Sequence, residues 1–190
     1  MQTGYLLLRS RHARQTLATL RMNSATGTDE LGTRILQSCA NELALPFCKL
    51  CRIIVNTGRW PDLWISHRIC PLHKQQTRYS AANYRGIQIT PQLSKAAERF
   101  IGRLFLPYLN TVTAFGPNQF AYSPGRGAKD ALLFLVLCWL LAFAHSKKIG
   151  LYCSDVSGAF DKVDASILLT KARTLGLNQK ILDVLYGWLC

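Results

Sequence analysis

The feature that most limits how this chain can fold is an unbroken apolar run, ALLFLVLCWLLAFA, at residues 131–144. A helix over this run would be apolar on every side, which predicts a helix buried in a protein core. A membrane crossing is the alternative, but it needs roughly 20 apolar residues, and this run is shorter. We therefore expect a core helix at 131–144 and no stable membrane association.

Length and charge indicate the class of protein. The chain has 190 residues, of which 49% are hydrophobic, enough for one folded body with its own core. Its 23 Lys and Arg residues exceed its 10 Asp and Glu residues, so the formal net charge is +13. Such an excess favours a polyanionic partner. Nucleic acid is the first candidate, and an acidic membrane surface is the competing one.

The seven cysteines are odd in number and follow no regular framework, and no secretory leader precedes them. We expect reduced intracellular thiols and no disulfides. One possible metal site has ligand types at a two-residue spacing followed by further ligands: Cys48, Cys51, His67, Cys70 and His73. The alternative, which we favour, is that both thiols of this pair pack in a helix core, because Phe47, Leu50, Cys51 and Ile54 recur at helical spacing.

Residues 1–21 form a basic leader. It contains Arg9, Arg11, Arg14 and Arg21, and no acidic residue precedes Asp29. This composition resembles an organelle transit peptide. It equally suits a disordered basic arm, or chain upstream of a truncated start, so organelle targeting stays one alternative among three.

The first half of the chain is expected to hold helices and a hairpin. Apolar residues at helical spacing predict two helices over 29–57, with a break near Pro46. Two short runs at 66–74 and 84–90 then predict the strands of a small β-hairpin.

The second half continues with helices and one strand. A helix is expected to begin with Thr90 as its N-cap and Pro91 as its first residue, and to end at Pro107. After the apolar helix, residues 147–155 alternate as a strand, and two helices separated by Gly176 follow. This order of elements indicates an α+β fold.

The stretch YCSDVSGAFDKVD, residues 152–164, contains three aspartates. Asp155 ends the expected strand, where a fixed carboxylate can hold a divalent cation next to substrate. Two-metal phosphoryl transfer needs ions about 3.5–4 Å apart, held by two or three convergent carboxylates. Asp161 and Asp164 lie beyond the turn, where capping of the next helix is the alternative role. Spacing alone therefore leaves a metal role for Asp155 open.

DVSGAFDKVD, followed by ILLTKARTLGL, closely resembles the first catalytic motif of reverse transcriptases, most like those of non-LTR (LINE-type) retrotransposons. Four earlier blocks resemble the successive fingers segments of that family, in order and spacing: SATGTDELGTRIL, TGRWPDLWISHRICPLHK, NYRGIQITPQLSKAAERFI and FGPNQFAYSPGRGAKDAL. The resemblance covers about residues 22–190. It implies a partial right-hand polymerase fold, with helix-rich fingers and a small β-hairpin over 22–130 and the start of an incomplete palm over 131–190.

The resemblance also implies roles in binding metal and nucleotide. Asp155 matches the aspartate that ligates both catalytic Mg²⁺ ions. Phe160 matches the bulky residue that excludes ribonucleotides at the sugar 2′ position, where steric exclusion is an effective means of selection. Arg85 matches the fingers arginine that reaches the dNTP triphosphate, and Lys74 is similar to the basic fingertip residue.

Two further residues, Gln119 and Arg126, fall in the block that lies along the template path in the family. For Gln119 the alternative is a structural bond to buried backbone, and for Arg126 it is a solvated turn. Ser123 departs from the family, which usually has arginine there. Gly86 departs as well, since proline usually follows the fingers arginine.

The chain ends at Cys190, before the next palm motif and the Asp-Asp box of the family, and it contains no Asp-Asp pair. We expect a fragment whose ancestral activity is RNA-templated DNA synthesis by two-metal nucleotidyl transfer, and which is inactive alone. Its expected partners are an RNA template, a DNA primer, Mg²⁺ and dNTP, and the family implies a nuclear site. The alternatives are a non-catalytic basic nucleic-acid-binding module and a non-functional, decayed retroelement product.

Overall fold

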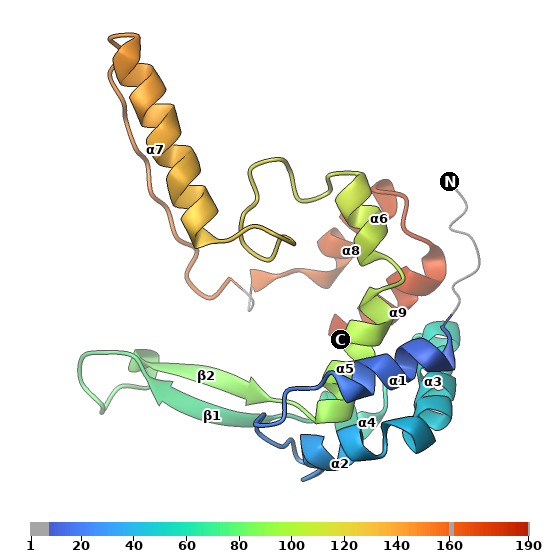
Figure 1. Ribbon diagram of the computed structural model, residues 1–190. Helices are drawn as coiled ribbons and strands as arrows, with labels where there is room; N and C mark the ends of the chain where they lie inside the picture. The colour runs from blue at the N-terminus through green and yellow to red at the C-terminus, as the bar shows by residue number, and fades with distance from the viewer. Residues whose placement is uncertain (1–7, 160–161, 190) are drawn as a thin grey trace. The chain divides into compact units, whose positions relative to one another are not determined.

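The computed structural model describes residues 8–159 and 162–189, and it is a mixture of helix and sheet, as expected (Figure 1). The described chain divides into two compact units rather than one body: residues 8–108 with 165–189, and residues 109–159 with 162–164. The expected boundary between 130 and 131 falls inside the second unit, and the assignment of fingers and palm to these parts stays a prediction.

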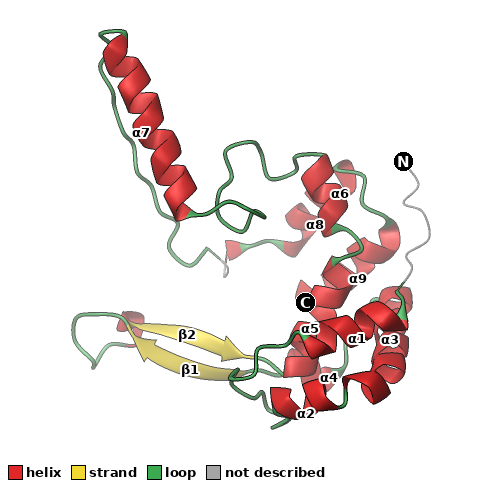
Figure 2. Cartoon of the chain, in the orientation of Figure 1, coloured by secondary structure: helices red, strands yellow, loops and turns green. Residues whose placement is uncertain are grey.

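The elements of the first unit are α1 (Ser10–Ala18), α2 (Thr33–Ser38), α3 (Ala40–Thr57), α4 (Asp62–Ile65), β1 (Arg68–His73), the 3₁₀ helix η1 (Ala81–Asn83), β2 (Tyr84–Ile89), α5 (Gln92–Gly102), α8 (Ala165–Thr174) and α9 (Gln179–Leu189) (Figure 2). α6 (Leu106–Thr111) runs across the boundary between the units, and the second unit contains α7 (Ala128–Ala144).

The core of the first unit lies where α3 packs against α1, α5 and α9. Phe47 of α3 stacks on Phe100 of α5, with ring centroids 5.8 Å apart. The Trp60 indole donates a hydrogen bond to the Val184 carbonyl of α9 at 3.0 Å. Chain segments more than 100 residues apart in sequence therefore share one core.

The described part of the N-terminal segment is not a disordered arm, because α1 packs in this core. Ala13, Leu17 and Leu20 are buried. The Leu8 carbonyl accepts two hydrogen bonds from the Arg52 guanidinium of α3, at 2.6 and 3.2 Å. Apolar residues recur every three to four positions between the arginines of the leader. This amphipathic pattern lets the segment form a helix that packs against the core.

The break between the two expected helices of 29–57 lies at Cys39, and Pro46 is inside α3. Pro46 is exposed, while the buried face formed by Ala44, Phe47 and Cys48 continues on both sides of it. Packing of that face outweighs the cost of a proline inside a helix, which is about 3 kcal/mol.

Helix α5 begins and ends at other residues than expected. Pro91, not Thr90, occupies its N-cap position, and the helix ends at Gly102. Pro107 is the second residue of α6. Proline is tolerated in the first turn of a helix, where its missing N–H has no partner, so Pro107 begins a new helix instead of ending the previous one.

The hairpin and the C-terminal helix pair are confirmed. β1 and β2 pair antiparallel, and Gly176, with φ of 86°, lies between α8 and α9. The strand expected at 147–155 is wrong, because residues 147–156 are in neither helix nor strand. A strand is stable only beside another strand, and the sheet found in the described residues consists of β1 and β2 alone.

Helix α7 lies at the surface, with Ala131, Trp139 and Ala142 half-buried and its other residues exposed, so the prediction of a buried core helix is wrong. None of its residues is buried. Besides α7, the described part of the second unit consists of the end of α6 and irregular segments. Phe120 of one such segment contacts Phe134 of α7, with ring centroids 5.8 Å apart, but most of the large apolar side chains of α7 stay exposed. Among the described helices, none has both the length and the apolar character that a bilayer crossing requires.

Both cysteines of the candidate metal pair are buried in α3, as we favoured, whereas Cys70 is exposed on β1. Burial raises the pKa of the Cys51 thiol from 9.0 to about 12, and the neighbouring Cys48 adds to the shift. Because the thiolate is the reactive form, Cys51 is expected to react with iodoacetamide much more slowly than Cys70 at pH 8.5.

Mass spectrometry of the labelled protein measures this difference in rate, and equal rates in the folded protein would contradict it. In denaturant both thiols are expected to react alike. The folded thiol stays protonated while the unfolded one ionises, so the contribution of Cys51 to stability declines as the pH rises from about 9 towards 12.

Candidate nucleic-acid interface

The hairpin β1–β2 is a basic part of the first unit that contains no acidic residue. Between Asp62 and Glu98 there is no acidic residue. The same stretch contains the basic residues Arg68, Lys74, Arg78, Arg85 and Lys95, of which the first four are exposed. An exposed cluster of positive charge without acidic neighbours is the usual electrostatic signature of a nucleic-acid-binding surface.

The strand register places the two predicted nucleotide-binding residues on one face. Leu72 pairs with Arg85. The ladder continues past the end of β1, because the Lys74 amide donates a hydrogen bond to the Asn83 carbonyl at 2.8 Å. Side chains alternate along a strand and opposite residues share a face, so Lys74 and Arg85 lie diagonally on the same face, and Arg68 joins them. We call Arg68, Lys74 and Arg85 the basic face.

The tip of the hairpin is held by its own hydrogen bonds. The Asn83 amide donates to the Thr77 carbonyl at 2.7 Å, and the Tyr84 hydroxyl donates to the Arg78 carbonyl at 3.0 Å. Tyr79, beside Arg78, is fully exposed. An exposed ring next to a cation is a suitable platform for stacking a nucleic-acid base. Arg68, Arg78 and Tyr79 were not among the residues predicted from the sequence, although the absence of acidic residues from 63 to 97 was a signal for them.

In the second unit, Gln119 and Arg126 line one pocket of about 270 Å³. The Arg126 guanidinium donates to the Pro117 carbonyl and lies 5.7 Å from the centre of the Phe120 ring. The Gln119 amide donates to the Ala121 carbonyl at 3.0 Å. Both side chains therefore have structural roles in an exposed loop, and the template role stays a prediction.

The turn SPGRG is formed as the sequence suggests. The Arg126 amide donates to the Ser123 carbonyl at 3.2 Å, and Gly125 has φ of 70°. With Pro124 before it, this is the arrangement of a type II turn, in which the third residue needs a positive φ. The turn fixes where Arg126 leaves the loop, so its contact with Phe120 is set locally.

Asp155 lies exposed in the irregular segment after α7. Phe160 and Asp161 lie outside the described residues. Among the residues that the structure describes, no three His, Cys, Asp or Glu side chains gather where they could hold a metal ion. Asp155 alone offers fewer carboxylates than a pair of Mg²⁺ ions needs, so the described residues do not fit a two-metal centre by themselves.

The predicted site residues thus form two groups within separate units. Lys74 and Arg85 lie on the hairpin of the first unit, and Gln119 and Arg126 line a pocket of the second unit. Asp155 belongs to the second unit but does not line that pocket. No protein-family model matches the chain, and no curated protein matches it either.

Proposed function

We propose that the chain contributes the fingers segment of a reverse transcriptase and binds an RNA template–DNA primer duplex and the triphosphate of a dNTP through hairpin β1–β2. The observation that carries the proposal is that Lys74 and Arg85 lie on the same face of the hairpin. An ammonium group and a planar guanidinium side by side suit a triphosphate, because the guanidinium can bind two oxygens at once.

No metal-dependent step is assigned to the described residues. Asp155 is proposed as one carboxylate of the Mg²⁺ site of a complete reverse transcriptase, in line with the motif around it. The role of the hairpin does not depend on that assignment, since its charges act directly on phosphate oxygens.

A second candidate is a non-catalytic nucleic-acid-binding module. The exposed cluster of positive charge on the hairpin favours it, because such a cluster can bind phosphates without metal or dNTP. Such a module would bind through phosphates, so its affinity would fall steeply with salt and would not respond to dNTP.

One binding experiment tests the proposal and separates it from the second candidate. Fluorescence anisotropy with a labelled RNA template–DNA primer is measured over a range of KCl, with and without Mg²⁺ and the dNTP complementary to the next template base. We expect the dNTP to tighten binding of the wild-type chain. The Lys74→Ala/Arg85→Ala variant should bind at least about tenfold more weakly, and its slope of log affinity against log salt should be smaller by about 2.

The matched control is Arg34→Ala/Lys49→Ala, which removes two exposed positive charges from α2 and α3. It should retain both the affinity and the response to dNTP. Tight binding without any response to dNTP would support the second candidate instead. An unchanged affinity in the Lys74/Arg85 variant would refute a role for the hairpin in either candidate.

A further inference from the structure

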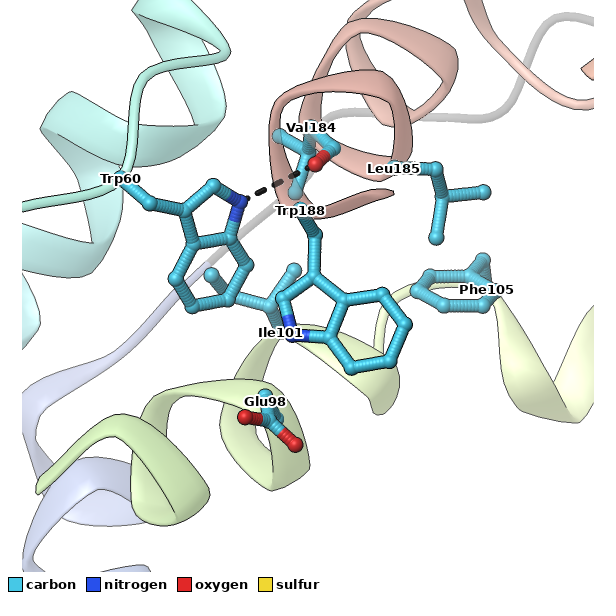
Figure 3. A pocket seen from close by; sticks show the side chains of 7 residues that line it. All are labelled: Trp60, Glu98, Ile101, Phe105, Val184, Leu185 and Trp188. Atoms are coloured by element: carbon cyan, nitrogen blue, oxygen red, sulfur yellow. Dashed lines mark hydrogen bonds between the residues drawn. The ribbon is translucent and has the colours of Figure 1, made fainter. Parts of the chain in front are cut away.

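The first unit also contains a pocket that includes none of the residues of the basic face. It is a pocket of about 200 Å³ lined by Trp60, Glu98, Ile101, Phe105, Val184, Leu185 and Trp188. Figure 3 shows the Trp188 indole between the rings of Trp60 and Phe105. Pockets for drug-sized molecules measure about 300–1,000 Å³, so this one has room for a small group only.

The aromatic walls of the pocket are of two kinds. Trp60 is buried, and its bond to the Val184 carbonyl holds its ring in place. Trp188 is 52% exposed, although it lines the same pocket. A fixed indole opposite a half-exposed one gives a ligand an apolar surface to cover without requiring the core to move.

The one charged group of the pocket lining is Glu98. The Ser94 hydroxyl donates to its carboxylate at 3.3 Å. Among the described residues, no Lys or Arg forms an ion pair with it, in a chain whose formal net charge is +13. Glu98 is thus a carboxylate without a cationic partner in a pocket lining that also includes three aromatic residues, and this composition favours a positively charged group over an anionic one.

We propose that this pocket binds a trimethylammonium group. Aromatic rings attract a cation through their negative faces, and a trimethylammonium group spreads its charge over methyl groups that suit an apolar wall. Its size is that of a single head group, in keeping with the pocket volume. An ordinary ammonium ion is more strongly hydrated and gains less from such a pocket.

Nuclear magnetic resonance titration of the whole chain with choline tests the proposal, with 3,3-dimethylbutan-1-ol, the uncharged analogue of choline, as the matched ligand. We expect choline to bind with a dissociation constant on the order of millimolar, and at least about tenfold more tightly than the alcohol. Free trimethyllysine is titrated in parallel. Preference for choline or for trimethyllysine would identify the source of the group, and both results support the site.

Two variants locate the binding. Trp188→Ala should weaken choline binding at least about tenfold, and Glu98→Gln should remove most of the preference for choline over the alcohol. Tyr186→Ala is the control, since Tyr186 is an exposed ring of α9 that is not among the residues lining the pocket. Equal affinity for choline and the alcohol in the wild-type chain, or full choline binding by the folded Glu98→Gln variant, would overturn the proposal.

Discussion

Gly187→Ala is expected to lower the melting temperature of the first unit by about 6–12 °C, through a loss of about 3 kcal/mol or more. A Cβ atom at Gly187 of α9 would collide with the carbonyl oxygen of Gly58, at the end of α3. That oxygen belongs to backbone that cannot move freely, because Gly58 ends α3 in the left-handed conformation, with φ of 69°. A methyl group there should therefore push α9 away from the core.

The sign of the change makes this a sharp test. Inside a helix, alanine is ordinarily more stable than glycine by about 0.5–1 kcal/mol, so helix propensity alone predicts a higher melting temperature. Gly150→Ala is a control for the glycine-to-alanine change itself, since Gly150 lies in an irregular segment of the second unit and no atom lies within 4 Å of a Cβ built there. Thermal unfolding followed by circular dichroism compares the three proteins. A Gly187→Ala variant as stable as the wild type would show that α9 does not pack on α3 as described.

The parts of the fold that could be predicted from the sequence are those set by neighbouring residues. The hairpin follows from two short runs separated by a polar loop, and the buried thiols of α3 follow from the helical spacing around Cys51. The backbone pairing of Lys74 with Asn83 likewise follows from the register of the hairpin strands. The same holds for Gln119 and Arg126, which meet in one pocket because they are seven residues apart in a single loop.

The errors concern interactions between distant segments. Burial of the apolar run at 131–144 needs a partner, and a sequence pattern does not say whether one is present. The strand expected at 147–155 needs a neighbouring strand in the same way. The hydrogen bonds from Arg52 to the Leu8 carbonyl join segments 44 residues apart, so the sequence left a disordered arm as one of three alternatives for the basic leader. The motif around Asp155 identifies one candidate metal ligand. The other carboxylates that a two-metal site needs come from distant segments, which a local motif does not identify.

Helix α7 is expected to make the chain self-associate. Nine of its large apolar side chains are exposed: Leu132, Leu133, Phe134, Leu135, Val136, Leu137, Leu140, Leu141 and Phe143. A contiguous apolar surface on one helix is more than a stable monomer usually exposes, and a second copy of α7 can cover it. Sedimentation velocity should therefore show species larger than the monomer, in proportions that rise with concentration. The variant Leu133→Gln/Leu140→Gln/Leu141→Gln should shift the distribution to the monomer and reduce the fluorescence of bound anilinonaphthalene sulfonate severalfold.

Glutamine is chosen because it favours a helix about as well as leucine, so the variant changes the polarity of α7 and not its secondary structure. The control is Leu45→Gln/Leu63→Gln/Leu106→Gln, which replaces three similarly exposed leucines that lie on three different helices. Scattered apolar side chains are normal on protein surfaces, so the control should leave both association and dye binding nearly unchanged. If the wild-type chain is a cooperatively melting monomer at high concentration, α7 does not mediate self-association. An exposed apolar surface is what a decayed, non-functional product would show, so that result would count against this alternative. Nucleic-acid binding by the hairpin would then be the proposal that accounts for the basic charge.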